Sequence, residues 1–113
     1  MKYFPIFADL AGQHVLLVGG NEDTARKLRL LLKTEANIRV VTSAPNAEIE
    51  AHAAAGRIDL RHRGFEGRDL EGVRLAIIGD AEALDVDWLA QQGRDTGIPT
   101  NVVDRPELST FII

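Results

Sequence analysis

Two consecutive glycines, Gly19 and Gly20, stand between an apolar run and a helix-like stretch in the segment HVLLVGGNEDTARK, residues 14–27. In dinucleotide-binding folds the first strand ends in a glycine-rich turn of this kind, usually G-x-G-x-x-G or G-x-G-x-x-A. The pyrophosphate then binds the free N–H groups at the start of the following helix. Phosphate binding is therefore the first chemistry that this segment suggests.

The turn departs from that pattern at two positions. Asn21 stands where the second glycine is usual, and Thr24 stands at the closing small residue. Asparagine tolerates a left-handed backbone better than most other residues, so we expect the turn to form. The Asn21 side chain would nevertheless occupy space that the backbone needs when it approaches a pyrophosphate.

Two acidic residues, Glu22 and Asp23, follow at the positive end of the predicted helix. Their carboxylates favour the helix themselves. A pyrophosphate would share this end with them, and like charges a few ångströms apart near a surface cost roughly 1 to 4 kcal/mol. The turn alone leaves two interpretations open: a nucleotide site, or a strand-to-helix turn with acidic capping and no ligand.

The second predicted strand ends without the acidic residue that grips a ribose hydroxyl in many dinucleotide-binding folds. Thr42 and Ser43 stand there, in VVTSAPNAE. Their hydroxyl or backbone groups could contact an adenosine ribose. The alternative is a plain loop that begins at Pro45.

Short β-branched or Leu-rich runs alternate with helical stretches along the chain. The predicted strands are residues 14–18, 38–42, 58–62, 75–78 and 100–104, and the predicted helices are 23–34, 46–55 and 82–96. Residues 66–72 are expected to form a loop or a short helical turn. Parallel strands need crossovers, and right-handed crossovers produce a doubly wound sheet. The pattern predicts one α/β domain over residues 1–113, with a Rossmann-like doubly wound parallel sheet in three layers.

The strands differ in their expected burial. Residues 14–18 and 75–78 are almost entirely apolar, as expected of parallel strands that are buried on both faces. Residues 58–62 are more polar, which predicts a position near the edge of the sheet.

The composition excludes several classes of protein. Lys and Arg number 13 against 17 Asp and Glu, and the net charge of −4 argues against broad nucleic-acid binding. The chain has no cysteine, and His14, His52 and His62 share no metal-ligand spacing. The opening stretch MKYFPIFADL is too short and too interrupted for us to expect a signal peptide, and no apolar run approaches membrane-spanning length. We expect no metal site, no nucleic-acid or membrane partner, and a cytoplasmic location.

Four stretches carry a resemblance to a known family. They are YFPIFADLAGQHVLLVGG (3–20), ARKLRLLL (25–32), the VVTSAP segment and GIPTNVVDRPELSTFI (97–112). Together they resemble the N-terminal NAD-binding module of siroheme synthase, the precorrin-2 dehydrogenase/sirohydrochlorin ferrochelatase family. The similarity runs in register along nearly the whole chain, and the opening and closing motifs are its most specific parts.

The resemblance implies an enzyme that oxidises precorrin-2 to sirohydrochlorin with NAD⁺, and many members then insert Fe²⁺ to give siroheme. It implies that Asp104, the aspartate of NVVD, is the general base of the oxidation and the proton acceptor or metal guide of iron insertion. Asp104 follows a predicted strand, at the edge where such sheets place their ligand crevice. A carboxylate partly buried there could take a proton from a pyrrole carbon or nitrogen. The alternative is a turn residue before Arg105 and Pro106.

The resemblance also implies where the cofactor binds. The implied residues are Gly19, Gly20, Asn21, Glu22 and Asp23 in the turn, Ser43 and Ala44 near the adenosine, and Gly79 and Asp80 after the fourth strand, where Gly79 gives close backbone approach. The family usually reads A-A-T-D after this strand and has an Asn in the next helix, whereas this chain has IGDA (78–81) and DVD (85–87). These departures fall on the cofactor cleft. They support a rival hypothesis, a non-catalytic module that serves assembly or ligand sensing.

Further expectations concern the rest of the protein. Family members continue beyond this point into a dimerisation segment and a helical region that completes the tetrapyrrole cleft. We therefore expect this chain to be a segment of a longer protein that forms a homodimer and takes a tetrapyrrole as its substrate.

Overall fold

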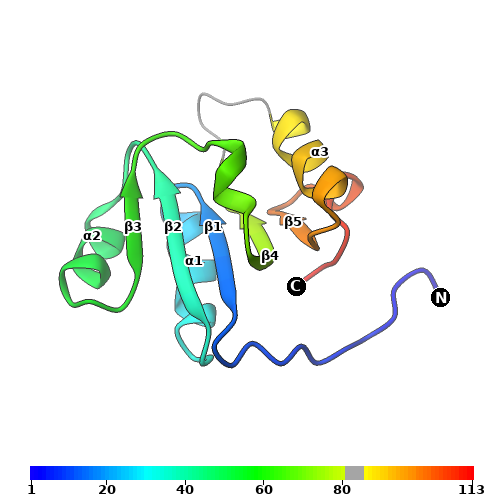
Figure 1. The fold of residues 1–113 in the computed structure, drawn as a ribbon, viewed down its shortest axis with the longest axis horizontal. Coiled ribbons are helices and arrows are strands. Elements are labelled where there is room, and N and C mark those ends of the chain that lie inside the picture. The colour runs from blue at the N-terminus through cyan, green and yellow to red at the C-terminus, as the bar shows by residue number, and fades with distance from the viewer. Residues whose placement is uncertain (81–85) are drawn as a thin grey trace.

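Five parallel strands form one sheet at the centre of the molecule (Figure 1). A computed structural model describes residues 1–80 and 86–113. The strands are β1 (His14–Val18), β2 (Asn37–Thr42), β3 (Asp59–His62), β4 (Val73–Ile78) and β5 (Thr100–Val102). Their order across the sheet is β3-β2-β1-β4-β5, and every neighbouring pair is parallel. This is the doubly wound topology that the alternation of elements predicts.

Helices cover both faces of the sheet. They are α1 (Glu22–Leu31), α2 (Ala47–Ala54) and α3 (Val86–Thr96), with two short 3-10 helices, η1 (Gly67–Leu70) and η2 (Pro106–Leu108). One core cluster contains residues of α1 and α2, and the other contains residues of η1 and α3. The Rossmann-like, three-layer fold is therefore confirmed. The sequence predicts that the last helix begins at residue 82, but residues 81–85 lie outside the described ranges.

The central strand β1 is buried on both faces, which explains its nearly unbroken apolar sequence. Val15 and Leu17 belong to the cluster that contains Leu28 of α1, whereas Leu16 belongs to the cluster that contains Leu89 of α3. Val15, Leu16 and Leu17 are each 0% exposed. At the other extreme, β3 forms one edge of the sheet and is mostly exposed, as its polar sequence predicts.

Two elements end earlier than the sequence predicts. Helix α1 stops at Leu31, because the Thr34 hydroxyl and amide both donate to the Leu31 carbonyl oxygen, at 2.6 and 2.9 Å, and close a turn there. Strand β5 stops at Val102, because the Arg105 amide donates to the Val102 carbonyl oxygen at 3.0 Å and reverses the chain.

The C-terminal segment covers the outer edge of β5. The Val102 amide donates to Ser109 Oγ, and the Thr100 amide donates to Thr110 Oγ1, each at 2.8 Å. The Thr110 amide donates in turn to the Thr100 carbonyl oxygen at 2.7 Å. These contacts satisfy backbone groups that an exposed edge strand would otherwise offer to another chain.

An ion pair between the partly exposed Arg63 and the buried Asp69 fixes the short crossover between β3 and β4. Asp69 is 2% exposed, and its two carboxylate oxygens accept hydrogen bonds from Arg63 at 2.9 and 2.7 Å. The Glu66 amide donates to the same carboxylate at 2.8 Å. Burial raises the pKa of Asp69, but these hydrogen bonds outweigh it, so the pKa lies below its ordinary value. A charged carboxylate thus organises the short helical turn that the sequence predicts here.

The first nine residues form neither helix nor strand and run away from the sheet (Figure 1). Phe4, Ile6 and Phe7 are 82%, 73% and 104% exposed. This segment therefore adds little to the core of the domain and leaves large apolar side chains on its surface.

Candidate functional site

The candidate residues gather at the end of the sheet where all the parallel strands have their carboxyl termini. Gly19 and Gly20 follow β1, Ser43 and Ala44 follow β2, Gly79 and Asp80 follow β4, and Asp104 lies just after β5. Hydrogen bonds join these loops: the Asn46 amide donates to the Gly20 carbonyl oxygen at 2.9 Å, and the Val103 amide donates to that of Ile78 at 3.0 Å. The fold thus brings together segments that are far apart in the sequence.

The glycine turn forms, and Asn21 adopts an extended rather than a left-handed backbone in it. Its φ is −93° and its ψ is −172°, which is extended, and the positive φ of the turn belongs to Gly19, at 130°. The Asn21 side chain accepts a hydrogen bond from the Thr24 amide at 3.1 Å. Asparagine is a preferred N-cap, and a capping side chain requires an extended backbone.

Glu22 and Asp23 turn away from the end of the helix toward arginines of α1. Glu22 Oε1 lies 3.0 Å from Arg29 Nη2, and Asp23 Oδ1 lies 3.0 Å from Arg26 Nη1. All four side chains are at least 41% exposed. Solvent and these partners screen the two carboxylates, so their repulsion of a phosphate is weaker than the sequence predicts.

A different carboxylate, that of Asp80, reaches the turn. Asp80 Oδ1 accepts hydrogen bonds from the Gly20 amide at 2.8 Å, the Asn21 amide at 3.2 Å and the Thr24 hydroxyl at 2.6 Å. Asp80 Oδ2 is buried and has no hydrogen-bond partner among residues 1–80 and 86–113. The sequence could not indicate this contact, since 60 residues separate Asp80 from Gly20.

Two glycines allow these loops to approach one another closely. A Cβ atom at Gly20 would lie 2.7 Å from the carbonyl carbon of Ala44, at the end of β2. A Cβ atom at Gly79 would lie 2.8 Å from Thr24 Cα, within α1. Both distances are shorter than real Cβ contacts, so only glycine fits, and Gly79 provides the close backbone approach that we expect of it.

Local contacts close the end of β2. Thr42 is buried, and its Oγ1 accepts a hydrogen bond from the Ala44 amide at 3.1 Å. His62, at the end of the edge strand β3, has Nε2 3.1 Å from the Ser43 carbonyl oxygen. Ser43 and Ala44 are exposed. These two residues, rather than Thr42, are therefore free to contact a ligand beside the turn.

Asp104 occupies a tight turn just beyond β5. Its φ is 63°, the only positive φ of a non-glycine residue in the described ranges. Ser109 Oγ donates to the Arg105 carbonyl oxygen at 3.0 Å and so helps to fix the turn. Residues held in this conformation tend to cluster at functional sites. Asp104 is exposed in this chain rather than partly buried as expected, and its geometry suits both a general base and a turn residue.

Whether a dinucleotide phosphate fits the turn depends on which backbone amides at the start of α1 are free to donate hydrogen bonds to it. Those of Gly20 and Asn21 already donate to Asp80. The amides of Glu22 and Asp23 donate to no acceptor within residues 1–80 and 86–113. They belong to the first turn of a ten-residue helix, whose dipole favours an anion. A phosphate group therefore fits at these two amides.

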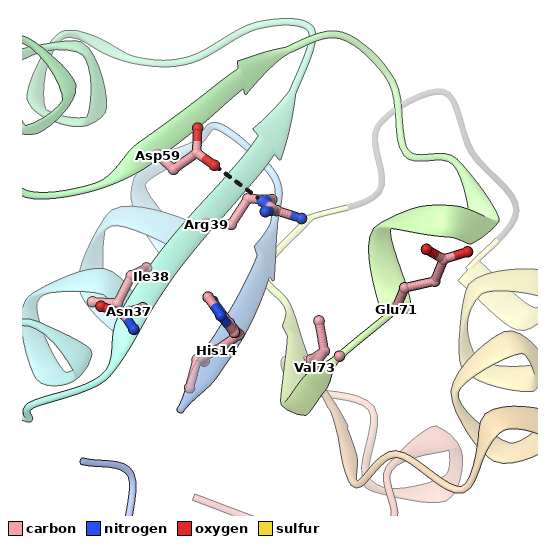
Figure 2. A pocket seen from close by; sticks show the side chains of 9 residues that line it. His14, Asn37, Ile38, Arg39, Asp59, Glu71 and Val73 are labelled. Carbon is pink, nitrogen blue, oxygen red and sulfur yellow. Dashed lines mark hydrogen bonds and ion pairs between the residues drawn. The ribbon is translucent and has the colours of Figure 1, made fainter. Parts of the chain in front are cut away.

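A groove of about 290 Å³ lies at the opposite, amino edge of the sheet (Figure 2). His14, Arg39, Asp59 and Glu71 line it, and Arg39 Nε donates to Asp59 Oδ2 at 3.1 Å. Burial raises the pKa of Asp59, but hydrogen bonds from Arg61 and Arg39 outweigh it and hold the pKa below its ordinary value. The charges of Arg39 and Asp59 in this groove are therefore already paired with each other.

Other kinds of site find no support in the structure. Within the described ranges, no cluster of three or more His, Asp or Glu side chains is placed to hold a metal ion. No helix in that part of the chain is long and apolar enough to cross a membrane. The hydroxyls of Ser109 and Thr110 bond to the backbone of β5. The positions Ala81 and Asp85, where the chain departs from the family pattern, lie outside the described residues.

The strand order and the glycine turn that opens α1 define the class of protein, a dinucleotide-binding domain. Comparison with protein families agrees, because the family described as "Putative NAD(P)-binding" matches residues 6–113. The chain belongs to this family, and the membership supports NAD as its cofactor.

Known proteins similar to this chain carry a common name. Siroheme synthase of Stutzerimonas stutzeri is 40% identical over 113 residues, which are 99% of this chain and 24% of that protein. Siroheme synthase of Methylococcus capsulatus is 42% identical over 112 residues, with the same two shares. The resemblance seen in the sequence is thus confirmed, and the chain spans about a quarter of the length of these relatives.

A solved structure also resembles the chain. It is "SirC, precorrin-2 dehydrogenase", which is 29% identical and aligns with a TM-score of 0.64. The alignment covers 67% of this chain and 38% of that one. The likeness supports the same fold and the same family.

Proposed function

We propose that this chain is the NAD⁺-binding domain of an enzyme that oxidises precorrin-2 to sirohydrochlorin. The observation that supports this most is that the glycine turn and the left-handed Asp104 both follow the carboxyl ends of parallel strands in one sheet. Parallel α/β sheets bind their ligands at these ends. The names of the relatives and of the structural neighbour suggest the substrate.

In this proposal, residues of the chain hold the cofactor and accept a proton. The amides of Glu22 and Asp23 would bind a phosphate oxygen, and Ser43 and Ala44 would lie beside the adenosine. NAD⁺ supplies a hydride acceptor when it is bound. Asp104 would take the proton that leaves the substrate when a hydride is transferred, so the two electrons leave with the hydride and the charge balances.

Further parts of the proposal concern the complete protein. Iron insertion releases pyrrole protons, and Asp104 would accept one of them. A homodimer is expected as well, because the exposed side chains of Phe4, Ile6 and Phe7 favour burial against another protein surface. Sedimentation at several concentrations of the complete protein tests the dimer. The cytoplasmic location stays a prediction.

A non-catalytic module is the second candidate. The observation that favours it is the Asp80 carboxylate, which already holds the amides of Gly20 and Asn21. Such a module would keep the scaffold and serve assembly or ligand sensing. It predicts no measurable binding of NAD⁺, so a calorimetric titration separates it from the enzyme.

Replacement of the proposed base tests the enzymatic role. Asp104→Asn removes the carboxylate, and asparagine tolerates the left-handed backbone that this turn requires. In the complete protein, we expect precorrin-2 oxidation, followed as NADH absorbance, to fall about a hundredfold or more. Glu107→Gln is the control, because Glu107 is an exposed carboxylate in the same loop that pairs with Arg105. Unchanged oxidation by Asp104→Asn would exclude Asp104 as the base.

A further inference from the structure

We propose that Asp80 sets the affinity of the turn for dinucleotides: its carboxylate holds backbone amides beside the phosphate site and weakens dinucleotide binding. This inference rests on the proposed function, because it concerns the same turn. It differs from the role that the family resemblance implies for Asp80, which is a contact with the cofactor.

The hydrogen bonds of Asp80 are those expected of a bound anion. A single oxygen, Oδ1, accepts from two consecutive backbone amides, Gly20 and Asn21, and from the Thr24 hydroxyl. Runs of backbone amides at a glycine-rich turn are the groups that bind phosphate in such folds. The carboxylate therefore occupies amides that a ligand phosphate could otherwise use.

Asp80 also fills the space that a glycine of the turn leaves open. A Cβ atom at Gly19 would lie 2.7 Å from the Asp80 amide nitrogen and would collide with Asp80 Oδ1. In dinucleotide-binding turns the first glycine serves the tight turn, which fits the positive φ of Gly19. Here the missing side chain makes room for another residue of the same chain.

The second oxygen of Asp80 shows that the carboxylate is not a simple stabilising contact. Oδ2 is buried, and no described residue of the chain forms a hydrogen bond with it. A buried, unsatisfied carboxylate oxygen opposes folding. The charge therefore carries a cost at Oδ2 that a neutral side chain of the same shape avoids, while such a side chain still offers one acceptor oxygen to the turn.

Asp80 is also the least screened of the nearby carboxylates. Glu22 and Asp23 each lie 3.0 Å from an arginine and are 61% and 41% exposed. No arginine or lysine in the described ranges forms an ion pair with Asp80. Its charge therefore acts most directly on a phosphate at the amides of Glu22 and Asp23.

Titration of NAD⁺ into matched variants tests this inference. Asp80→Asn keeps the shape and one acceptor oxygen but removes the charge, and we expect it to bind NAD⁺ about tenfold more tightly than the natural sequence. Asp59→Asn makes the same change at the opposite end of the sheet, in a residue that pairs with Arg39, and we expect a change of roughly twofold or less. Calorimetry measures both affinities, and the rise of Tm with NAD⁺ gives an independent readout.

The outcomes separate this inference from the proposed function. Equal NAD⁺ affinity of the natural chain and Asp80→Asn would overturn the role of Asp80 and leave the cofactor site standing. Absence of binding by both proteins would overturn both proposals, because removal of the charge would then have revealed no site. If Asp80→Asn fails to fold, Asp80→Ser, which is smaller and also neutral, is judged by the same two criteria.

Discussion

The hydrogen bond between Thr24 and Asp80 allows a quantitative test of the turn. Thr24 is 0% exposed, and its hydroxyl donates to Asp80 Oδ1 at 2.6 Å. A hydrogen bond to a charged group contributes about 1.5 to 3 kcal/mol. Thr24→Val keeps the shape of the side chain and removes the donor, so we expect it to lower the free energy of unfolding by about 2 kcal/mol. For a domain of this size the matching fall in Tm is about 8 °C.

A double-mutant cycle isolates this contact. Urea unfolding of the natural chain, Thr24→Val, Asp80→Ala and the double variant should give a coupling free energy of about 1.5 kcal/mol or more. Thr24→Ser is the control, since it keeps the hydroxyl and should remain coupled to Asp80. Additive effects, within roughly 0.5 kcal/mol, would show that the hydrogen bond between Thr24 and Asp80 does not stabilise the fold.

Three further predictions follow from other contacts. Asp69 has a pKa below its ordinary value, so its charge stabilises the fold above the unfolded pKa of about 3.9, and this stability is lost as the pH falls through the folded pKa. Asp69→Asn should therefore lower Tm at neutral pH and make Tm fall less steeply as the pH is lowered. An unchanged fall of Tm in acid would contradict this. Gly79→Ala places a Cβ 2.8 Å from Thr24 Cα and should cost roughly 1 to 3 kcal/mol in urea unfolding, whereas Gly67→Ala, whose Cβ meets Gln92 Oε1 at 3.7 Å, should cost less. Because Asp104 has a φ of 63°, Asp104→Val should lower stability by roughly 1 to 2 kcal/mol and Asp104→Gly should not, and equal losses would exclude strain at this turn.

Local patterns were sufficient to predict the scaffold. The apolar run at 14–18 has no polar face, and only a parallel strand between two layers buries it completely. The run that forms β3 carries polar side chains, which need contact with solvent, and in a sheet covered by helices an edge strand provides that contact. Each inference depends on residues that are neighbours in the sequence, so periodicity and length carry the information.

The details of the site depend on contacts that local patterns do not contain. From the sequence we considered only the left-handed tolerance of Asn21, whereas the structure shows its side chain capping α1 by accepting from the Thr24 amide. The sequence showed Glu22 and Asp23 as the acidic residues next to the turn, yet both side chains pair with exposed arginines of the same helix. Asp80 reaches the turn only because β4 lies beside β1, which is a property of the assembled sheet.

The most direct test of the central claim is an amide-resolved NMR titration of this chain with NAD⁺. The claim is that the first amides of α1 bind a dinucleotide phosphate. We predict that the amide signals of Glu22 and Asp23 shift most, with smaller shifts at Ser43 and Ala44. Signals that do not move, or that move only around His14 and Arg39 in the groove at the opposite edge, would contradict the account.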